Sequence, residues 1–283
     1  MNPLNHKIDF AVILSVAKAN PNGDPLNGNR PRQNYDGYGE ISDVALKRKI
    51  RNRLQDMGEG IFVQSDDRKT DGYKSLRERA DANPELAKIL KAKNPSADEF
   101  ARIACREWID VRSFGQVFAF KGSELSVGVR GPVSIQVATS IDPINIVSTQ
   151  ITKSVNSVTG EKRSSDTMGM KHRVDFGVYV FKGSINTQLA EKTGFSKDDA
   201  DKIQQALVTL FANDSSAARP DGSMEVHKVY WWEHSSKLGQ YSSAKVHRLL
   251  AVKSKSEEPK SFADYEIELQ ELDGLGVEVL DGQ

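Results

Sequence analysis

The feature that most constrains the fold is a run of alternating apolar residues at the start of the chain. Within 6–17, apolar side chains stand at every second position. Alternation with a period of two is typical of a β-strand that buries one face. The segment 172–182 repeats this pattern, which predicts two long strands far apart in sequence. Shorter strands are predicted over 125–138, 224–232, 245–253 and 262–272.

Two amphipathic helices are expected between these strands. Ser42 is a candidate N-cap for the first helix, and Ser196 for the second. The first helix carries an apolar stripe at Leu46, Ile50, Leu54 and Met57. The resulting order is strand, helix, strand, strand, helix, strand. This α+β order is the ferredoxin-like arrangement that RNA-recognition domains share.

Two further segments do not fit that core and are expected to be insertions. Residues 65–110 contain two helix starts, one at Asn83-Pro84 and one at Ser96. Residues 139–171 hold eleven Ser or Thr and four Lys or Arg, without a helical period. A segment of that length is either functional or disordered, so we expect a projecting loop or hairpin.

The charge is segregated along the chain. Lys plus Arg and Asp plus Glu both number 39, but residues 257–283 contain nine acidic residues and one lysine. The remainder is therefore net basic, which suits a polyanion binder or a subunit whose ends attract neighbouring subunits. The single cysteine, Cys105, excludes an intrachain disulfide and a cysteine-based zinc site.

Two groups of cations make up the candidate binding surface. The first lies on the helix after Ser42, where the stretch 47–53 has five cations and no acid. The alternative interpretation is a solvated face with long cationic side chains. The second group belongs to the projecting segment and the strand after it: Lys153, Lys162, Arg163, Lys171 and Arg173. Two basic elements on one body can hold a phosphate backbone without reading bases.

Common enzyme motifs are missing. The segment from Gly23 to Gly28 has the glycine spacing of a phosphate-binding loop, but Asn29-Arg30 replaces the Lys and Ser/Thr that hydrolysis requires. Neither Gly-x-Ser-x-Gly nor His-Glu-x-x-His occurs. The five histidines are scattered, and a structural role is the simpler expectation for each. We therefore expect no catalytic residue, no metal, no cofactor and no membrane segment, and a cytoplasmic location.

Four features give the sequence a resemblance to a known family. They are the first strand with its Asn-Pro-Asn-Gly-Asp-Pro loop at 20–25, Ser42 with the run 45–51, the motif Asp-Val-Arg-Ser-Phe-Gly at 110–115, and the insertion before 172–182. The chain resembles the crRNA-binding backbone subunit of type I CRISPR Cascade in the RAMP superfamily, most closely its I-C branch. The resemblance implies a modified RRM-like palm over 1–57, 125–138 and 172–283. It also implies helical fingers at 58–124 and a β-hairpin thumb at 139–171.

By motif position, the resemblance implies that the first helix grips the RNA through Ser42, Lys47, Arg48 and Arg51. With the other cations, the full set of candidate RNA-binding residues is Ser42, Lys47, Arg48, Lys49, Arg51, Arg112, Lys153, Lys162, Arg163, Lys171 and Arg173.

The expected partners are the crRNA, target DNA paired to that guide, further copies of the chain arranged head to tail, a guide-processing subunit and a large subunit. Two alternatives stay open. One is a backbone endoribonuclease that cleaves target RNA with Asp24 or Asp36, and the other is a general single-stranded RNA-binding module.

Overall fold

The computed structural model describes residues 2–120, 125–152 and 168–283. The fold is α+β, and its centre is an eight-stranded sheet. The strands run in the order β14-β11-β1-β10-β8-β4, and β7 and β9 also pair with β10. The strands of this sheet are β1 (Ile8–Ala19), β4 (Tyr38–Ile41), β7 (Val133–Ile135), β8 (Ala138–Pro143), β9 (Ile146–Thr152), β10 (Met168–Ile185), β11 (Met224–Glu233) and β14 (Glu278–Asp281). In the described part of the chain, no helix is long and apolar enough to cross a membrane.

The two long alternating segments of the sequence pair with each other at the middle of this sheet. Strands β1 and β10 are antiparallel, with Ile8 opposite Ile185 and Ala19 opposite Val174. Both faces of the sheet are covered, because Trp231 and Trp232 point in opposite directions and are each at most 2% exposed. A base-stacking role for either tryptophan would require an exposed ring, so both act as core residues here.

Three helices cover the first face of the sheet: α1 (Asp43–Asp56), α6 (Thr187–Thr193) and α7 (Lys197–Val208). The predicted caps are confirmed, since the Ser42 hydroxyl accepts a hydrogen bond from the N–H of Ala45 and Ser196 forms a capping box with Asp199. Leu46, Ile50 and Leu54 of α1 are fully buried against the sheet.

A small hairpin and a short helix cover the opposite face. The hairpin pairs β12 (Leu250–Ser254) with β13 (Tyr265–Leu269), which the turn η3 (Phe262–Asp264) precedes, and the helix is α8 (Ser243–His247). The prediction of a continuous strand over 245–253 is wrong at its start. Ser242 caps α8 through its hydroxyl, and strand structure begins only at Leu250.

A second hydrophobic core lies beside the sheet and is built from residues between Phe62 and Val127. Its elements are α2 (Leu76–Ala82), α3 (Pro84–Leu90), α4 (Ala97–Glu107), α5 (Ile109–Phe114), β5 (Gly115–Ala119) and β6 (Ser126–Arg130). Strand β6 pairs with β5, whereas β7 joins β10 in the large sheet. The predicted strand region 125–138 is therefore split at Gly131-Pro132 between two sheets.

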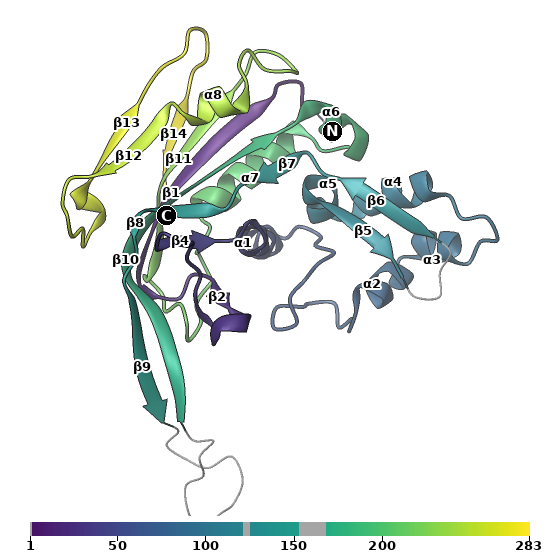
Figure 1. Cartoon of the computed structure of the whole chain (residues 1–283). Helices are drawn as coiled ribbons and strands as arrows, with labels where there is room; N and C mark the ends of the chain where they lie inside the picture. The colour runs from purple at the N-terminus through teal and green to yellow at the C-terminus, as the bar shows by residue number, and fades with distance from the viewer. Residues whose placement is uncertain (1, 121–124, 153–167) are drawn as a thin grey trace, which may run out of the picture.

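The segment 139–171 includes a projecting hairpin. Residues 146–152 of β9 pair with residues 168–174 of β10, which continues from the central sheet into the hairpin. At the base of this hairpin lie the short strands β2 (Gly23–Asp24) and β3 (Arg30–Pro31), joined by the turn η1 (Pro25–Asn27). Figure 1 shows the hairpin extending from one side of the body and α2–α5 on the other, with α1 between them.

Candidate nucleic-acid interface

A polar hollow lies beside α1 where four separate segments of the chain meet. It has a volume of about 360 Å³, and its walls come from α1 and from residues 21–23, 65–68 and 213–219. We call this site the α1 hollow. It contains four cationic residues, Arg48, Lys49, Arg68 and Arg219, against two acidic ones. Positive charge that converges in a concave site is what a phosphate group requires.

Arg48 and Lys49 are neighbours in sequence but differ in their surroundings. Arg48 is partly exposed, and its Nη1 donates a hydrogen bond of 2.6 Å to the carbonyl of Val63. Lys49 is only 4% exposed and forms an ion pair with Asp214. Burial lowers the pKa of Lys49 to about 8, although the adjacent carboxylate of Asp214 opposes this shift. Lys49 therefore acts first as a partner for Asp214, and Arg48 is the more available cation.

The other two cations of the α1 hollow come from loops that lie close to each other in the fold. Arg219 donates from Nε to the Asp214 carboxylate at 3.2 Å, so Asp214 serves both Arg219 and Lys49. Arg68 donates 2.7 Å to the carbonyl of Asn213 and pairs with Asp56. These contacts hold the loop 213–219 against α1.

One buried polar atom of the α1 hollow, Oδ1 of Asn52, has no hydrogen-bond partner among the described residues. Because buried polar groups are normally paired, such an atom marks a position where a ligand group or water completes the site. Ser42 lies nearby, with its N–H bonded to Oδ1 of Asn22 at 2.9 Å, while its hydroxyl is used as the helix cap.

The remaining predicted cations near α1 all have acidic partners. Lys47 pairs with Asp43 at 2.9 Å, one turn away on the helix. Arg51 donates 3.0 Å to Asp110, which is completely buried. Distant segments supply the acidic partners of Lys49 and Arg51, and Asp43 on the same helix supplies that of Lys47, so these three cations are not a purely solvated face.

Arg112 is also committed to an internal contact. Its Nε and Nη2 donate to the two carboxylate oxygens of Asp199 at 3.0 and 2.8 Å, and the two side chains are 11% and 4% exposed. This bidentate pair joins α5 to the start of α7. Hydrogen bonds to Arg112 and Ser196 lower the pKa of Asp199 against the opposing effect of its burial.

The second group of predicted cations is found on the projecting hairpin. Lys171 is exposed and Arg173 half-buried, and the pairing places both on the same face of β10. The opposite face carries His172, whose Nδ1 lies 2.8 Å from the Ser148 hydroxyl, which also accepts 3.0 Å from Arg30. Three predicted residues, Lys153, Lys162 and Arg163, lie outside the described residues.

The catalytic alternative assigned a role to Asp24 or Asp36. The Asp24 carboxylate accepts a hydrogen bond of 3.2 Å from the N–H of Leu26 and so caps the turn η1. Its other contact is a 3.6 Å approach to Arg32. Among the described residues, no three His, Cys, Asp or Glu side chains lie together so that they could hold a metal ion. These contacts give Asp24 the turn-forming role that its sequence context predicts.

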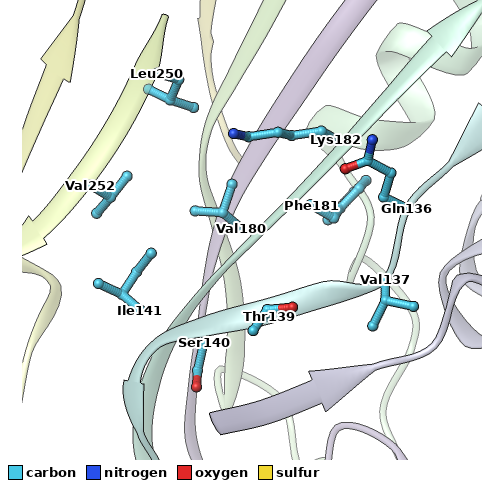
Figure 2. A pocket seen from close by; sticks show the side chains of 10 residues that line it. All are labelled: Gln136, Val137, Thr139, Ser140, Ile141, Val180, Phe181, Lys182, Leu250 and Val252. Carbon is cyan, nitrogen blue, oxygen red and sulfur yellow. The ribbon is translucent and has the colours of Figure 1, made fainter. Parts of the chain in front are cut away.

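A second hollow of the same volume, about 360 Å³, lies between β8, β10 and β12 on the opposite face (Figure 2). Most of its lining is aliphatic or aromatic, and its one cation is Lys182. The Lys182 ammonium donates 2.6 Å to the carbonyl of His247, and burial lowers its pKa. Charge therefore distinguishes the two hollows, and only the α1 hollow suits a polyanion.

The model of the family described as "CRISPR-associated protein Cas7" matches residues 6–270. The chain belongs to the Cas7 family. A curated relative, "CRISPR-associated protein Cas7" of Haloferax volcanii, is 25% identical over 290 aligned positions, covering 96% of this chain and 83% of the relative. The family resemblance inferred from the motifs is thus confirmed across most of the chain.

The fold also resembles that of a solved chain. That chain comes from a structure described as "CRISPR RNA-guided surveillance complex, pre-nicking", with a TM-score of 0.50 and 16% identity, covering 80% of this chain and 78% of that one. The similarity concerns the fold, a large antiparallel sheet with helices around it.

Sequence reasoning did not find three side chains that the Cas7 structure brings to the α1 hollow: Asn22, Arg68 and Arg219. Arg219 follows two alanines in a loop without periodicity. Arg68 follows Asp66 and Asp67, whose negative charges offset its positive charge in a local count. The one signal in the sequence for this region is the turn-rich loop at 20–25, which carries part of the family resemblance but to which no binding role was assigned.

Proposed function

We propose that this chain is a non-catalytic backbone subunit of a CRISPR surveillance complex. Several copies bind head to tail along one guide RNA, protect it and present it for pairing with target DNA. The observation that carries this proposal is the match to the Cas7 family over residues 6–270. The α1 hollow agrees with it, because this hollow offers cations and amides that can hold a phosphate backbone.

The parts of such a subunit map onto the fold as follows. The large sheet with α1 and α7 is the RRM-like palm, over 1–57, 125–138 and 172–283, except that β6 at the start of 125–138 pairs with β5 and packs in the second core. The second hydrophobic core forms the helical fingers within 58–124, and the hairpin of β9 and β10 belongs to the thumb at 139–171. A separate core supports fingers that fold as a unit. The I-C subtype and a cytoplasmic location remain predictions.

The expected partners are the crRNA, other copies of the chain, a guide-processing subunit, a large subunit, and target DNA through the guide. A basic body and an acidic C-terminal segment favour a heterologous contact, which propagates as an open helix. The solved structure that contains the similar chain is described as a CRISPR RNA-guided surveillance complex, which agrees with this assignment.

Purification of the tagged chain from its native host, followed by sequencing of the bound RNA, tests the proposal. One defined class of guide RNA is the expected result. A mixed population of cellular RNA would instead favour a general single-stranded RNA binder. In a parallel reaction with Mg²⁺, labelled complementary RNA should stay intact, and regularly spaced fragments that disappear in Asp24→Asn would establish the ribonuclease alternative.

A further inference from the structure

The motif Asp110 to Gly115 is the one resemblance-bearing feature to which the proposed function assigns no role. It forms the short helix α5 at the junction between the second core and the palm. Arg112 points from this helix to Asp199 of α7, whereas Asp110 points toward α1. The motif thus contacts both palm helices from one position.

The carboxylate of Asp110 is fully buried and accepts three hydrogen bonds. Its Oδ1 accepts from the N–H of Phe62 at 2.7 Å, and its Oδ2 accepts from the N–H of Val63 at 3.1 Å and from Nε of Arg51 at 3.0 Å. Arg51 also lies over the ring of Phe114, at 5.1 Å from the ring centroid. Arg51 thereby supplies the charge that a buried carboxylate needs.

The backbone at 62–63, which donates to Asp110, also accepts the hydrogen bond that positions Arg48. The Val63 carbonyl accepts the 2.6 Å hydrogen bond from Arg48, and Arg48 lines the α1 hollow. We propose that Asp110 is a positioning residue for RNA binding: it fixes the backbone at 62–63 and thereby directs Arg48 toward a guide phosphate. This inference rests on the proposed function. It also assigns Arg51 to Asp110, as its charge partner, and not to the RNA.

A merely structural role for Asp110 predicts something different. If this carboxylate only stabilised the fold, its loss would weaken RNA binding equally whether or not Arg48 is present. If it acts through Arg48, its substitution should no longer weaken RNA binding once Arg48 has been removed, because the effects of substitutions at coupled residues are not additive. A double-mutant cycle separates the two roles.

The experiment measures binding of a labelled single-stranded RNA to the full chain over a series of salt concentrations. Asp110→Asn and Arg48→Ala should each weaken binding about tenfold, as expected for a hydrogen-bonded charge, and should each flatten the log-affinity against log-salt slope by about 0.7. In the Arg48→Ala background, Asp110→Asn should change neither quantity. If Asp110→Asn alone does not fold, the combination with Arg51→Met removes both buried charges and takes its place in the cycle.

The matched control is Glu59→Gln. Glu59 lies close in sequence to the 62–63 backbone and forms its ion pair with Lys202 of α7 at 2.6 Å, away from Arg48 and Asp110 in the ion-pair network. It should bind RNA like the wild type. A wild-type affinity for Asp110→Asn, or a loss that persists in the Arg48→Ala background, would overturn the inference while leaving the proposed function intact. Failure of the wild type to bind RNA would contradict both.

Discussion

Lys47 and Arg51 lie one turn apart on α1, yet their acidic partners differ in burial. The Asp43 carboxylate beside Lys47 is 37% exposed, whereas the Asp110 carboxylate beside Arg51 is 0% exposed. A surface ion pair contributes little to stability, but removing one member of a buried pair leaves an uncompensated charge. The two cations therefore have different roles despite their similar positions in the sequence.

This difference predicts a difference in stability. Arg51→Ala should lower the free energy of unfolding by about 3 kcal/mol, because it leaves the Asp110 carboxylate buried without its cation. Lys47→Ala, the matched control on the same helix, should change it by less than about 1 kcal/mol. Urea unfolding followed by circular dichroism measures both values. Equal values for the two variants would show that the Arg51–Asp110 pair is not the internal support described here.

His247 offers a prediction about pH. Its Nε2 lies 2.9 Å from the Gly183 carbonyl, and the charged groups around it are Asp9, Lys7 and Lys182. Burial is the main cause that lowers the pKa of His247 below its ordinary value of 6.5. Below pH 6.5 the unfolded chain therefore takes up a proton that the folded chain resists, so stability falls as the pH falls.

In His247→Gln, an amide replaces the ring and can still donate to the Gly183 carbonyl. As the pH is lowered from 7 toward 5, the unfolding free energy of the wild type should therefore fall relative to that of the variant. Thermal or urea unfolding at several pH values gives this difference. A difference that stays constant over the range would show that His247 does not titrate differently in the folded state.

At the scale of elements, local signals predicted much of the fold and little of the site. Caps such as Ser42 and Ser196 act on N–H groups within the next turn, so the sequence contains the whole interaction. The partners of the buried α1 cations come from elsewhere: Asp214 lies 165 residues from Lys49, and Asp110 lies 59 residues from Arg51. Only the tertiary fold brings these acids to the helix, so no local sequence pattern predicts them.

The prediction of a strand over 245–253 was wrong at its start because the local apolar pattern fits two structures. Apolar residues at Val246, Leu249 and Leu250 suit either a strand or the buried side of a short helix followed by a strand. The hydroxyl of Ser242 decides between them, because it accepts from the N–H of Lys245 and begins α8. Periodicity alone could not separate these alternatives over so short a segment.

The hairpin of β9 and β10 gives a prediction for an element. Residues 150–170 can be replaced by an Asn-Gly turn that joins Thr149 directly to Lys171, because these residues are opposite each other in the register. The contacts among Arg30, Ser148 and His172 then remain. The sheet should fold normally, since the described residues of the removed arm, 150–152 and 168–170, belong to none of the hydrophobic cores.

In the shortened variant, RNA bound to the assembled protein should become more accessible to added ribonuclease, because the covering hairpin is gone. Digestion of the bound RNA, followed by gel analysis, compares the variant with the full chain. Unchanged protection, with a normal circular dichroism spectrum, would remove the thumb role from this segment.

At the scale of the whole molecule, the fold combines one large sheet, a second core and a projecting hairpin, with α1 between the last two (Figure 1). The α1 hollow draws its walls from both the palm segments and the loop 65–68 near the second core. An extended polyanion crossing this surface would contact several elements of one copy and continue onto the next. A closed dimer would not extend this path from one copy to the next.

The most direct test of this account is the number of copies bound to RNAs of increasing length. Mass photometry of the purified chain, mixed with single-stranded RNAs of several lengths, measures this number in units of the 31.3 kDa protomer. We predict that the number of protomers per RNA rises in proportion to RNA length. A fixed number of protomers at every length, or a closed oligomer of the same size with and without RNA, would contradict the assignment as a backbone subunit.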